Sequence, residues 1–367
     1  MKSLNQLIIT LMACLFSIQA WAQSGKLFNT DNQLSSNLAT QVFQDKSGFI
    51  WIATRNGLNT YDGYHITVMK KDMSNFFGLK SNYINSIAQD DKEHILLGTN
   101  NSLLEFTGSE FHKIPMLDSK GEELATYVKQ VYPLKNKDVA VATSGYGIMI
   151  KKKDAQECHA MKGEVEKLKY IHKLLEDKRG RLWIITEDGK LYRKETNGRV
   201  TSHFVGTEGV DAQDIQQDVL GNLYLASKNQ GVHLLRAGSN VFTRISSIGN
   251  LPIENIYISR NNKLYIGCDG LGIYVYDPQT GFLQDNPLFS RLVNLAKSKV
   301  TSIIEDNQGN IWVSMLQKGV FMQSNIQNDF NYMGFRLGSR NVIGENCVTS
   351  LSINQGNQVW VGTDKDG

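Results

Sequence analysis

The sequence predicts an all-β protein: a β-propeller of seven four-stranded blades, followed by the start of an eighth repeat. Three observations lead to this fold class. A unit of 41 to 48 residues recurs along the chain, its apolar segments are short and rich in Val, Ile, Tyr and Trp, and Gly, Asp or Asn separates them. Short β-prone segments between turn residues favour strands over helical repeats of the same length, and four such strands make a propeller blade.

Tryptophan marks the second strand of the unit. All four tryptophans that follow residue 22 occupy one position of the repeat, and tyrosine takes that position in two further units. We therefore expect this side chain to pack in the core between neighbouring blades. From the first unit to the eighth, the aligned residues are Trp51, Leu96, Ala140, Trp183, Tyr224, Tyr265, Trp312 and Trp360.

The remaining strands follow from the residues around this position. The first strand, such as "ATQVFQD", leads into a turn with Asp at its start and Gly three residues later, which is typical of hairpins. The third strand opens at a Gly, as in "GLNTYD", and a more variable fourth strand follows, as in "HITVMK", "VFTRIS" and "DFNYMG". The third unit departs most from the pattern, because Ala140 replaces the tryptophan and Leu134 replaces the turn aspartate.

The segment "GKLFNTDNQ" before the first unit resembles an orphan fourth strand. We expect it to complete the last blade, which would close the ring and remove an exposed edge. The expected domains are a signal peptide at residues 1–22, a seven-bladed propeller within residues 23–335 and the truncated start of a further repeat or second propeller at residues 336–367. A ring of eight blades is the alternative.

The N-terminus has the features of a secretory signal peptide: Lys2, the apolar stretch "LIITLMACLFSI" and the small residues Ala20 and Ala22. Cleavage is expected after Ala22, which predicts a periplasmic or secreted protein. A lipoprotein with Cys14 as the lipidated residue is the alternative. No later stretch has 18 consecutive apolar residues, so we expect no membrane span in the rest of the chain.

The composition argues against several function classes. The 39 basic and 36 acidic residues nearly balance, so nucleic-acid binding finds no support. The histidines are scattered singly and the turn aspartates are one repeat apart, so we expect no metal site and no cofactor. Three cysteines in an exported chain do not make a disulfide framework, and we expect Cys158, Cys268 and Cys347 to be small buried residues.

The unit "LSSNLATQVFQDKSGFIWIATRNGLNTYDG", residues 34–63, resembles the two-component regulator propeller repeat. The leading "LSSN", the D-x-x-G turn, the I-W-I-x-T strand and N-G-L coincide in order within it. The same pattern recurs in "LKSNYINSIAQD", "VTSIIEDNQGNIWVS" and "VTSLSINQGNQVWVGTDKDG", so the resemblance covers essentially the whole chain after residue 22. This repeat is typical of the periplasmic sensor part of hybrid two-component systems in Bacteroidetes.

The resemblance implies a phosphorelay sensor that detects glycan fragments and controls genes for polysaccharide utilisation. Its relatives typically carry two propellers, an immunoglobulin-like domain, one membrane helix and cytoplasmic kinase, receiver and DNA-binding domains. Histidine kinase activity, and any homodimer contact, would then belong to parts C-terminal to this chain, which itself is expected to be no enzyme. The alternatives are a secreted glycosidase or lyase acting on polysaccharide, and a protein-interaction scaffold.

The last repeat stops at Gly367, where its third strand should begin. We therefore expect the chain to be a piece of a longer sensor, with a naturally short protein as the alternative.

A ligand is expected on one face of the ring. The loops between second and third strands and the connections between blades open on the same side of a propeller. They carry amides, tyrosines and a few charges, which suit a hydroxyl-rich oligosaccharide, although Asn and Asp are also common turn residues. No catalytic residues are predicted, and the expected ligand-binding residues are Arg55, Asn56, Tyr83, Asn100, Tyr146, Asp188, Asp269 and Lys318.

Overall fold

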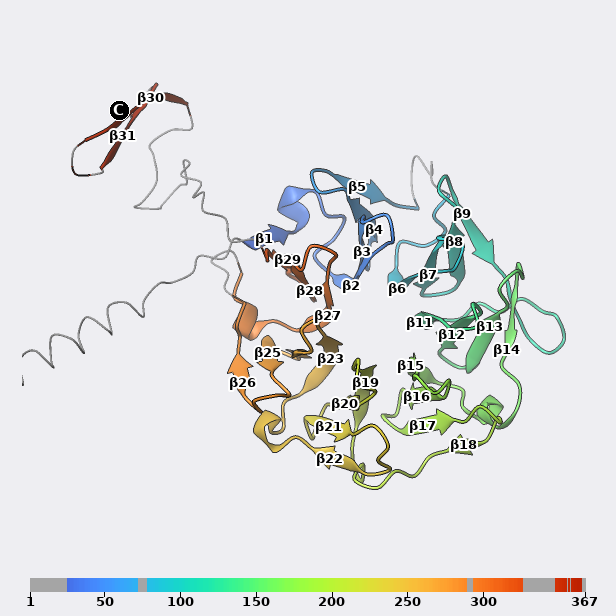
Figure 1. The fold of residues 1–367 in the computed structure, drawn as a ribbon. Helices are drawn as coiled ribbons and strands as arrows, with labels where there is room; N and C mark the ends of the chain where they lie inside the picture. Colours follow the sequence, from blue (N-terminus) through green and yellow to red (C-terminus); the bar gives the residue numbers. More distant parts are fainter. Residues whose placement is uncertain are drawn as a thin grey trace, which may run out of the picture. The chain divides into compact units, whose positions relative to one another are not determined.

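The computed structural model describes residues 25–71, 78–288, 293–325, 347–354, 356 and 358–364. The chain forms two compact units, Met1–Asn325 and Ile326–Gly367. In the first unit seven sheets surround a central axis (Figure 1). The predicted seven-bladed all-β propeller is confirmed. The expected signal peptide, residues 1–22, lies outside the described residues.

Each blade contains four antiparallel strands. These strands run in chain order from the axis outwards, except in the last blade. Blade 1 consists of β2 (Ala39–Gln44), β3 (Ile50–Thr54), β4 (Gly57–Tyr61) and β5 (Ile66–Met69). Blade 2 consists of β6 (Ile84–Gln89), β7 (Ile95–Thr99), β8 (Leu103–Phe106) and β9 (Phe111–Ile114). Blade 3 consists of β11 (Val128–Pro133), β12 (Val139–Thr143), β13 (Ile148–Lys151) and β14 (Cys158–Ala160). Blade 4 consists of β15 (Ile171–Glu176), β16 (Leu182–Thr186), β17 (Leu191–Lys194) and β18 (Val200–Thr201).

The remaining three blades repeat this order. Blade 5 consists of β19 (Ala212–Gln217), β20 (Leu223–Ser227), β21 (Val232–Leu235) and β22 (Phe242–Arg244). Blade 6 consists of β23 (Ile253–Ile258), β24 (Leu264–Cys268), β25 (Ile273–Tyr276) and β26 (Leu283–Asp285). Blade 7 consists of β27 (Val300–Glu305), β28 (Ile311–Met315), β29 (Gly319–Gln323) and, outermost, β1 (Gly25–Phe28).

Strand β1 closes the ring as predicted. It pairs antiparallel with β29, so the first described segment of the chain completes the last blade. The Phe28 ring stacks on Trp312 at 5.3 Å and meets Tyr61 of blade 1 edge-on at 4.9 Å, which joins the two ends of the ring through one aromatic cluster. The expected strand "DFNYMG", residues 329–334, lies outside the described residues.

Short elements interrupt the regular pattern. Strand β10 (Met116–Leu117), in the connection from blade 2 to blade 3, pairs in parallel with β14, so blade 3 has a fifth strand that the repeat did not predict. Four single turns of 3-10 helix lie in other connections: η1 (Thr30–Asn32), η2 (Glu164–Lys167), η3 (Ser246–Ile248) and η4 (Leu295–Lys297).

The turn between the first and second strands needs one residue with positive φ. Glycine takes this position in four blades, for example Gly48 with φ 94°. Elsewhere a residue with a side chain adopts it: Glu93 at 68°, Lys137 at 71° and Asn262 at 60°. The third unit therefore forms the same turn as the others, although it lacks both the Asp and the Gly of the pattern.

The tryptophans occupy equivalent positions, as predicted. Trp51, Trp183 and Trp312 lie on the second strands of their blades and are buried. Their indole N–H groups also donate to the turn aspartates Asp45, Asp177 and Asp306, at 2.8, 2.9 and 2.7 Å. The two most regular residues of the repeat are therefore hydrogen-bond partners.

A polar residue on each innermost strand links neighbouring blades. Each of these strands has an irregularity in its pairing near its start, and the residue that follows it reaches the next blade. In six blades its oxygen accepts a backbone N–H of the neighbour: Gln41 from Ile87, Ser86 from Val131, Gln130 from Leu174, Asp214 from Ile256, Asn255 from Ile303 and Ser302 from Val42.

Lys173 in blade 4 is the exception to these links. Its ammonium cannot accept a hydrogen bond, and it forms an ion pair with Asp214 of blade 5 at 3.1 Å instead. The Asp214 side chain also accepts the N–H of Ile215 within its own blade.

The second unit is an antiparallel hairpin of β30 (Val348–Ile353) and β31 (Val359–Thr363). It has the same pairing irregularity as the blades, between Val348 and Ser350. Leu351 and Trp360 are exposed, because two strands provide little core of their own.

One expectation about the cysteines was wrong. Cys347, next to the hairpin, is exposed rather than buried. Cys158 and Cys268 are buried as predicted, and burial raises the pKa of each thiol to about 12. Within the part of the chain that the structure describes, no helix is long and apolar enough to cross a membrane.

Candidate ligand-binding site

One face of the ring gathers the segments expected to bind ligand. Each innermost strand runs away from this face, and the second strand returns to it. In every blade the N–H of the residue after the second strand donates to the carbonyl of the residue before the innermost strand. We call this side the entry face, and its seven donor–acceptor pairs are Arg55–Leu38, Asn100–Tyr83, Ser144–Tyr127, Glu187–Tyr170, Lys228–Asp211, Asp269–Pro252 and Leu316–Lys299.

Three consecutive blades carry tyrosine at the acceptor position. Tyr83, Tyr127 and Tyr170 precede the innermost strands of blades 2, 3 and 4, and we call them the tyrosine arc. The rings of Tyr83 and Tyr127 meet edge-on at 6.0 Å, and the Tyr127 hydroxyl donates to Asn85 at 2.7 Å. Burial and the neighbouring Tyr83 phenol raise the pKa of Tyr127, so it keeps its proton at neutral pH. Tyr170 is 59% exposed.

Two cations lie over the arc. The guanidinium of Arg55 is 5.4 Å from the centre of the Tyr83 ring, and the ammonium of Lys129 is 4.8 Å from the centre of the Tyr127 ring. Lys129 also lies 3.6 Å from the carboxylate of Glu187. Aromatic faces attract cations, so the rings hold both side chains in place.

A polar cavity of about 470 Å³, which we call the throat, lies along the innermost strands. The second residue of every innermost strand lines it: Thr40, Asn85, Lys129, His172, Gln213, Glu254 and Thr301. Burial and three lysines, Lys173, Lys129 and Lys228, lower the pKa of His172 to about 4. The imidazole is therefore neutral at neutral pH.

Two further cavities adjoin blade 4. One of about 490 Å³ is lined by Tyr170, Glu187 and Asp188, and one of about 580 Å³ by Asp188, His203 and Asp211. Tyr192 lines both. Lys129 of the throat pairs with Glu187 of the smaller cavity, so the throat and this cavity adjoin. Together with the tyrosine arc they form one polar and aromatic surface that reaches from blade 1 to blade 5.

The predicted site residues fall into two groups. Arg55 and Tyr83 are in contact, and Asp188 lines the two cavities beside blade 4. Asn56 and Tyr146 are exposed in the second-to-third-strand loops of blades 1 and 3.

The other three predicted residues have partners that stabilise the fold. The Asn100 side chain accepts from Ser81, and Asp269 pairs with Lys299 at 2.7 Å. The Lys318 ammonium donates to the carbonyls of Asn294 and Lys297 and to the Ser298 hydroxyl.

Several residues of the site were missed from the sequence: Tyr127, Tyr170, Lys129 and His172. An indication was present, because Tyr83, Tyr127 and Tyr170 each stand thirteen residues before the tryptophan position of their unit. Aligning the repeat at that position would have revealed the tyrosine arc.

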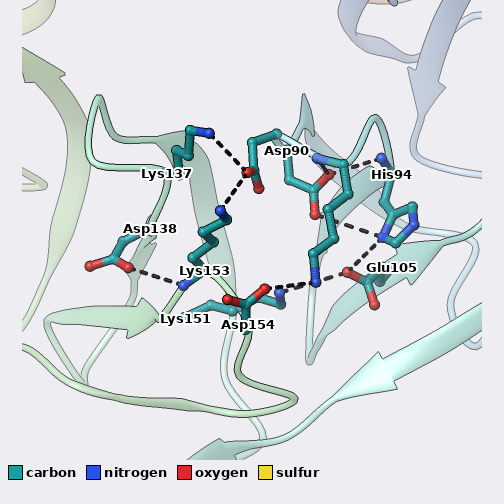
Figure 2. Close-up of polar contacts among 10 residues, drawn as sticks. Asp90, His94, Glu105, Lys137, Asp138, Lys151, Lys153 and Asp154 are labelled. Atoms are coloured by element: carbon teal, nitrogen blue, oxygen red, sulfur yellow. Dashed lines mark hydrogen bonds and ion pairs between the residues drawn. The ribbon is translucent and has the colours of Figure 1, made fainter.

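One cluster in the described residues could place three metal ligands together. Asp90, His94 and Glu105 have ligand atoms within 4.8 Å of one another (Figure 2). The buried ammonium of Lys151, from blade 3, lies 3.7 Å from Glu105 and already supplies positive charge. The cluster occurs in the blade where Leu96 replaces tryptophan, and there the His94 imidazole lies 3.7 Å from the turn aspartate Asp90. We therefore interpret it as a structural ion-pair network.

Comparison with known proteins identifies the repeat. The family model described as two component regulator propeller matches residues 33–56 and 294–317, which span the first hairpins of blades 1 and 7. The chain carries two-component regulator propeller repeats. A search of curated protein sequences finds no match.

Solved structures share the regulator propeller fold. The extracellular domain of BT3049 from B. thetaiotaomicron, named as a hybrid two-component system, has a TM-score of 0.73 at 22% identity, over 93% of this chain and 47% of that one. The extracellular domain of BT4673 from the same organism gives 0.69 at 16% identity, over 94% and 47%. The regulator propeller thus spans about half the length of these two structures.

A virginiamycin B lyase from Staphylococcus aureus is also similar. Its TM-score is 0.64 at 12% identity, over 83% of this chain and 99% of the lyase. Likeness at such identities demonstrates a common fold and does not extend to activity.

Proposed function

We propose that this regulator propeller is the ligand-sensing part of an exported hybrid two-component signalling protein, and that it detects glycan fragments in the periplasm. The repeat family and the likeness to extracellular domains of Bacteroides systems support the sensing role. The observation that carries the choice of site is the tyrosine arc beside the polar throat, because aromatic rings and amides are groups that bind sugar rings and hydroxyls.

Binding without turnover fits the carboxylates in and around the throat. The carboxylates of Glu187, Asp214 and Glu254 each pair with a lysine, at 3.6, 3.1 and 2.8 Å. A glycosidase needs two carboxyl groups that face the scissile bond, whereas these three carboxylates are engaged by lysines of the protein. We therefore favour a sensor over a polysaccharide-degrading enzyme.

We also propose that residues 336–367 begin a further repeat that belongs to a second propeller. The hairpin β30–β31 reproduces the pairing irregularity of the blades, and Trp360 stands at the tryptophan position. The similar Bacteroides structures are about twice as long as the part this chain matches, which agrees with a second domain of this kind.

Calorimetry with a panel of neutral oligosaccharides tests the sensing proposal. Arg55→Ala and Tyr83→Ala should each weaken binding by roughly 10-fold while the melting temperature is unchanged. Tyr64→Ala is the matched control, because Tyr64 is 86% exposed in the β4–β5 turn at the opposite face. Equal affinity in all three variants would exclude the entry face.

Chromatography of the same mixtures tests the alternative function. New, shorter sugar products would overturn the proposal in favour of a glycosidase or lyase.

A further inference from the structure

Several lysines of the entry face already have a carboxylate partner. Within the described residues these ion pairs are Lys129 with Glu187, Lys173 with Asp214, Lys190 with Asp188, and Lys299 with Glu254 and Asp269. These lysines have their charge balanced inside the protein, so they offer little to an anionic ligand.

Arg55 differs from these lysines. It is exposed, and within the described part of the chain no carboxylate lies within ion-pair distance of its guanidinium. The Tyr83 ring holds the side chain in place, and Tyr127 supports that ring from its edge. No side chain or carbonyl in the described part of the chain accepts a hydrogen bond from the N–H groups of the Arg55 guanidinium, whose fork geometry matches a carboxylate or a sulfate.

We infer that the glycan sensed by this propeller carries an acidic group, a uronic acid carboxylate or a sulfate, and that Arg55 binds this group beside the tyrosine arc. This inference rests on the proposed function and specifies its ligand. The aromatic rings would contact the sugar ring that bears the acid, while the amides of the entry face bind its hydroxyls.

The electrostatics of the throat agree with this choice. Lys228 occupies in blade 5 the position that Arg55 has in blade 1, and it too is exposed. Lys173, Lys129 and Lys228 all act, together with burial, to lower the pKa of His172. Lys228 has no carboxylate within ion-pair distance in the described part of the chain, so it offers an anionic ligand a second cation on the entry face.

Matched pairs of oligosaccharides test the acidic group. One pair is tetragalacturonate and its fully methyl-esterified form, and the other is a sulfated galactan (carrageenan) tetrasaccharide, which has no carboxylate, and its desulfated form. Affinities are measured by calorimetry with the chain that follows residue 22. The acidic member of at least one pair should bind about 10-fold or more tightly than its partner at low salt, and which pair shows it distinguishes carboxylate from sulfate.

Variants assign the preference to Arg55. Arg55→Ala should abolish it, and Arg55→Lys should keep only part of it, because an ammonium is a point charge without the fork. Arg179→Ala is the control, since Arg179 is an exposed arginine in the β15–β16 turn at the opposite face.

Two results would overturn the inference. Equal affinity for both members of each pair, or a preference that survives in Arg55→Ala, would show that Arg55 does not recognise an acidic group. The sensing proposal would be unaffected. Failure of all four oligosaccharides to bind would also overturn the inference. Calorimetry with the neutral oligosaccharides would then test the sensing proposal separately.

Discussion

A single carboxylate connects each regular turn to the strand that follows it. In blade 1 Asp45 accepts the backbone N–H of Phe49 with one oxygen, at 2.9 Å, and the indole N–H of Trp51 with the other, at 2.8 Å. Blade 2 lacks the indole, and there the His94 ring lies 3.7 Å from the equivalent Asp90 and 3.3 Å from Glu105, which Lys151 approaches to 3.7 Å. A buried carboxylate needs donors, and Asp90 obtains its own from the backbone N–H groups of Lys92 and His94, at 2.9 Å each.

Trp51→Phe should lower the free energy of unfolding by about 2 kcal/mol or more, because Asp45 loses a donor while it stays buried. In an Asp45→Ala background the same substitution should cost clearly less, which urea denaturation can measure. Trp360→Phe is the control, since that indole is 65% exposed. Equal costs in both backgrounds would mean that the hydrogen bond contributes nothing.

The stability of the ring should fall with acidity because of His172. Its pKa is about 4 in the folded protein, lowered by burial and by three lysines, against about 6.5 for an unperturbed histidine. Between these values the unfolded chain binds more protons, so this contribution is complete above pH 6.5 and is lost as the pH falls toward 4. His172→Gln, which introduces the residue that Gln213 provides at the same position of the next blade, should reduce the loss of melting temperature between pH 7.5 and pH 5. An identical loss in both proteins would contradict this.

At the scale of elements, the repeat predicts strands well because their pattern is local. Turn residues and β-prone segments predicted four strands in each blade. The open edge of the last blade predicted that β1 would pair there. Strand β10 was missed because it is two residues long and lies in a connection. The links of Gln41, Gln130 and Asn255 to neighbouring blades were missed because they join residues more than 40 positions apart.

Strand β1 should be essential for closure. Phe28→Ala should cost about 3 to 5 kcal/mol, because the ring is buried against Trp312 and Tyr61. Phe282→Ala removes an equal side chain that is 64% exposed and should cost little. Chemical denaturation of both variants measures the difference, and similar costs would show that β1 does not hold the ring closed.

At the scale of the molecule, the propeller has all its sheets without the hairpin. Deleting residues 346–367 should leave the melting temperature nearly unchanged, because β1 already occupies the outer edge of blade 7. It should also improve solubility, since exposed apolar side chains such as Leu351 are removed. Calorimetry of the shortened chain is the measurement, and a large drop in melting temperature would indicate that the hairpin belongs to an eight-unit ring.

The residues of the candidate site were harder to choose from the sequence than the strands of the fold. Propeller topology predicted which loops share a face, and Arg55 with Tyr83 followed from it. Some loop residues already have partners in a neighbouring blade or connection. Asp269 pairs with Lys299, and Lys318 donates to the carbonyls around η4. Such contacts leave no mark on a single repeat, so Asp269 and Lys318 could not be separated from Arg55 in the sequence.

We propose above that the entry face of this seven-bladed regulator propeller binds a glycan. A crystal structure of the chain with the tightest oligosaccharide of the panels tests it most directly. We expect the sugar over the tyrosine arc, with a polar group in hydrogen-bond contact with Arg55 and the chain extending toward the throat or the cavities beside blade 4. A sugar bound at the turns of the opposite face, or along the outermost strands, would contradict the account.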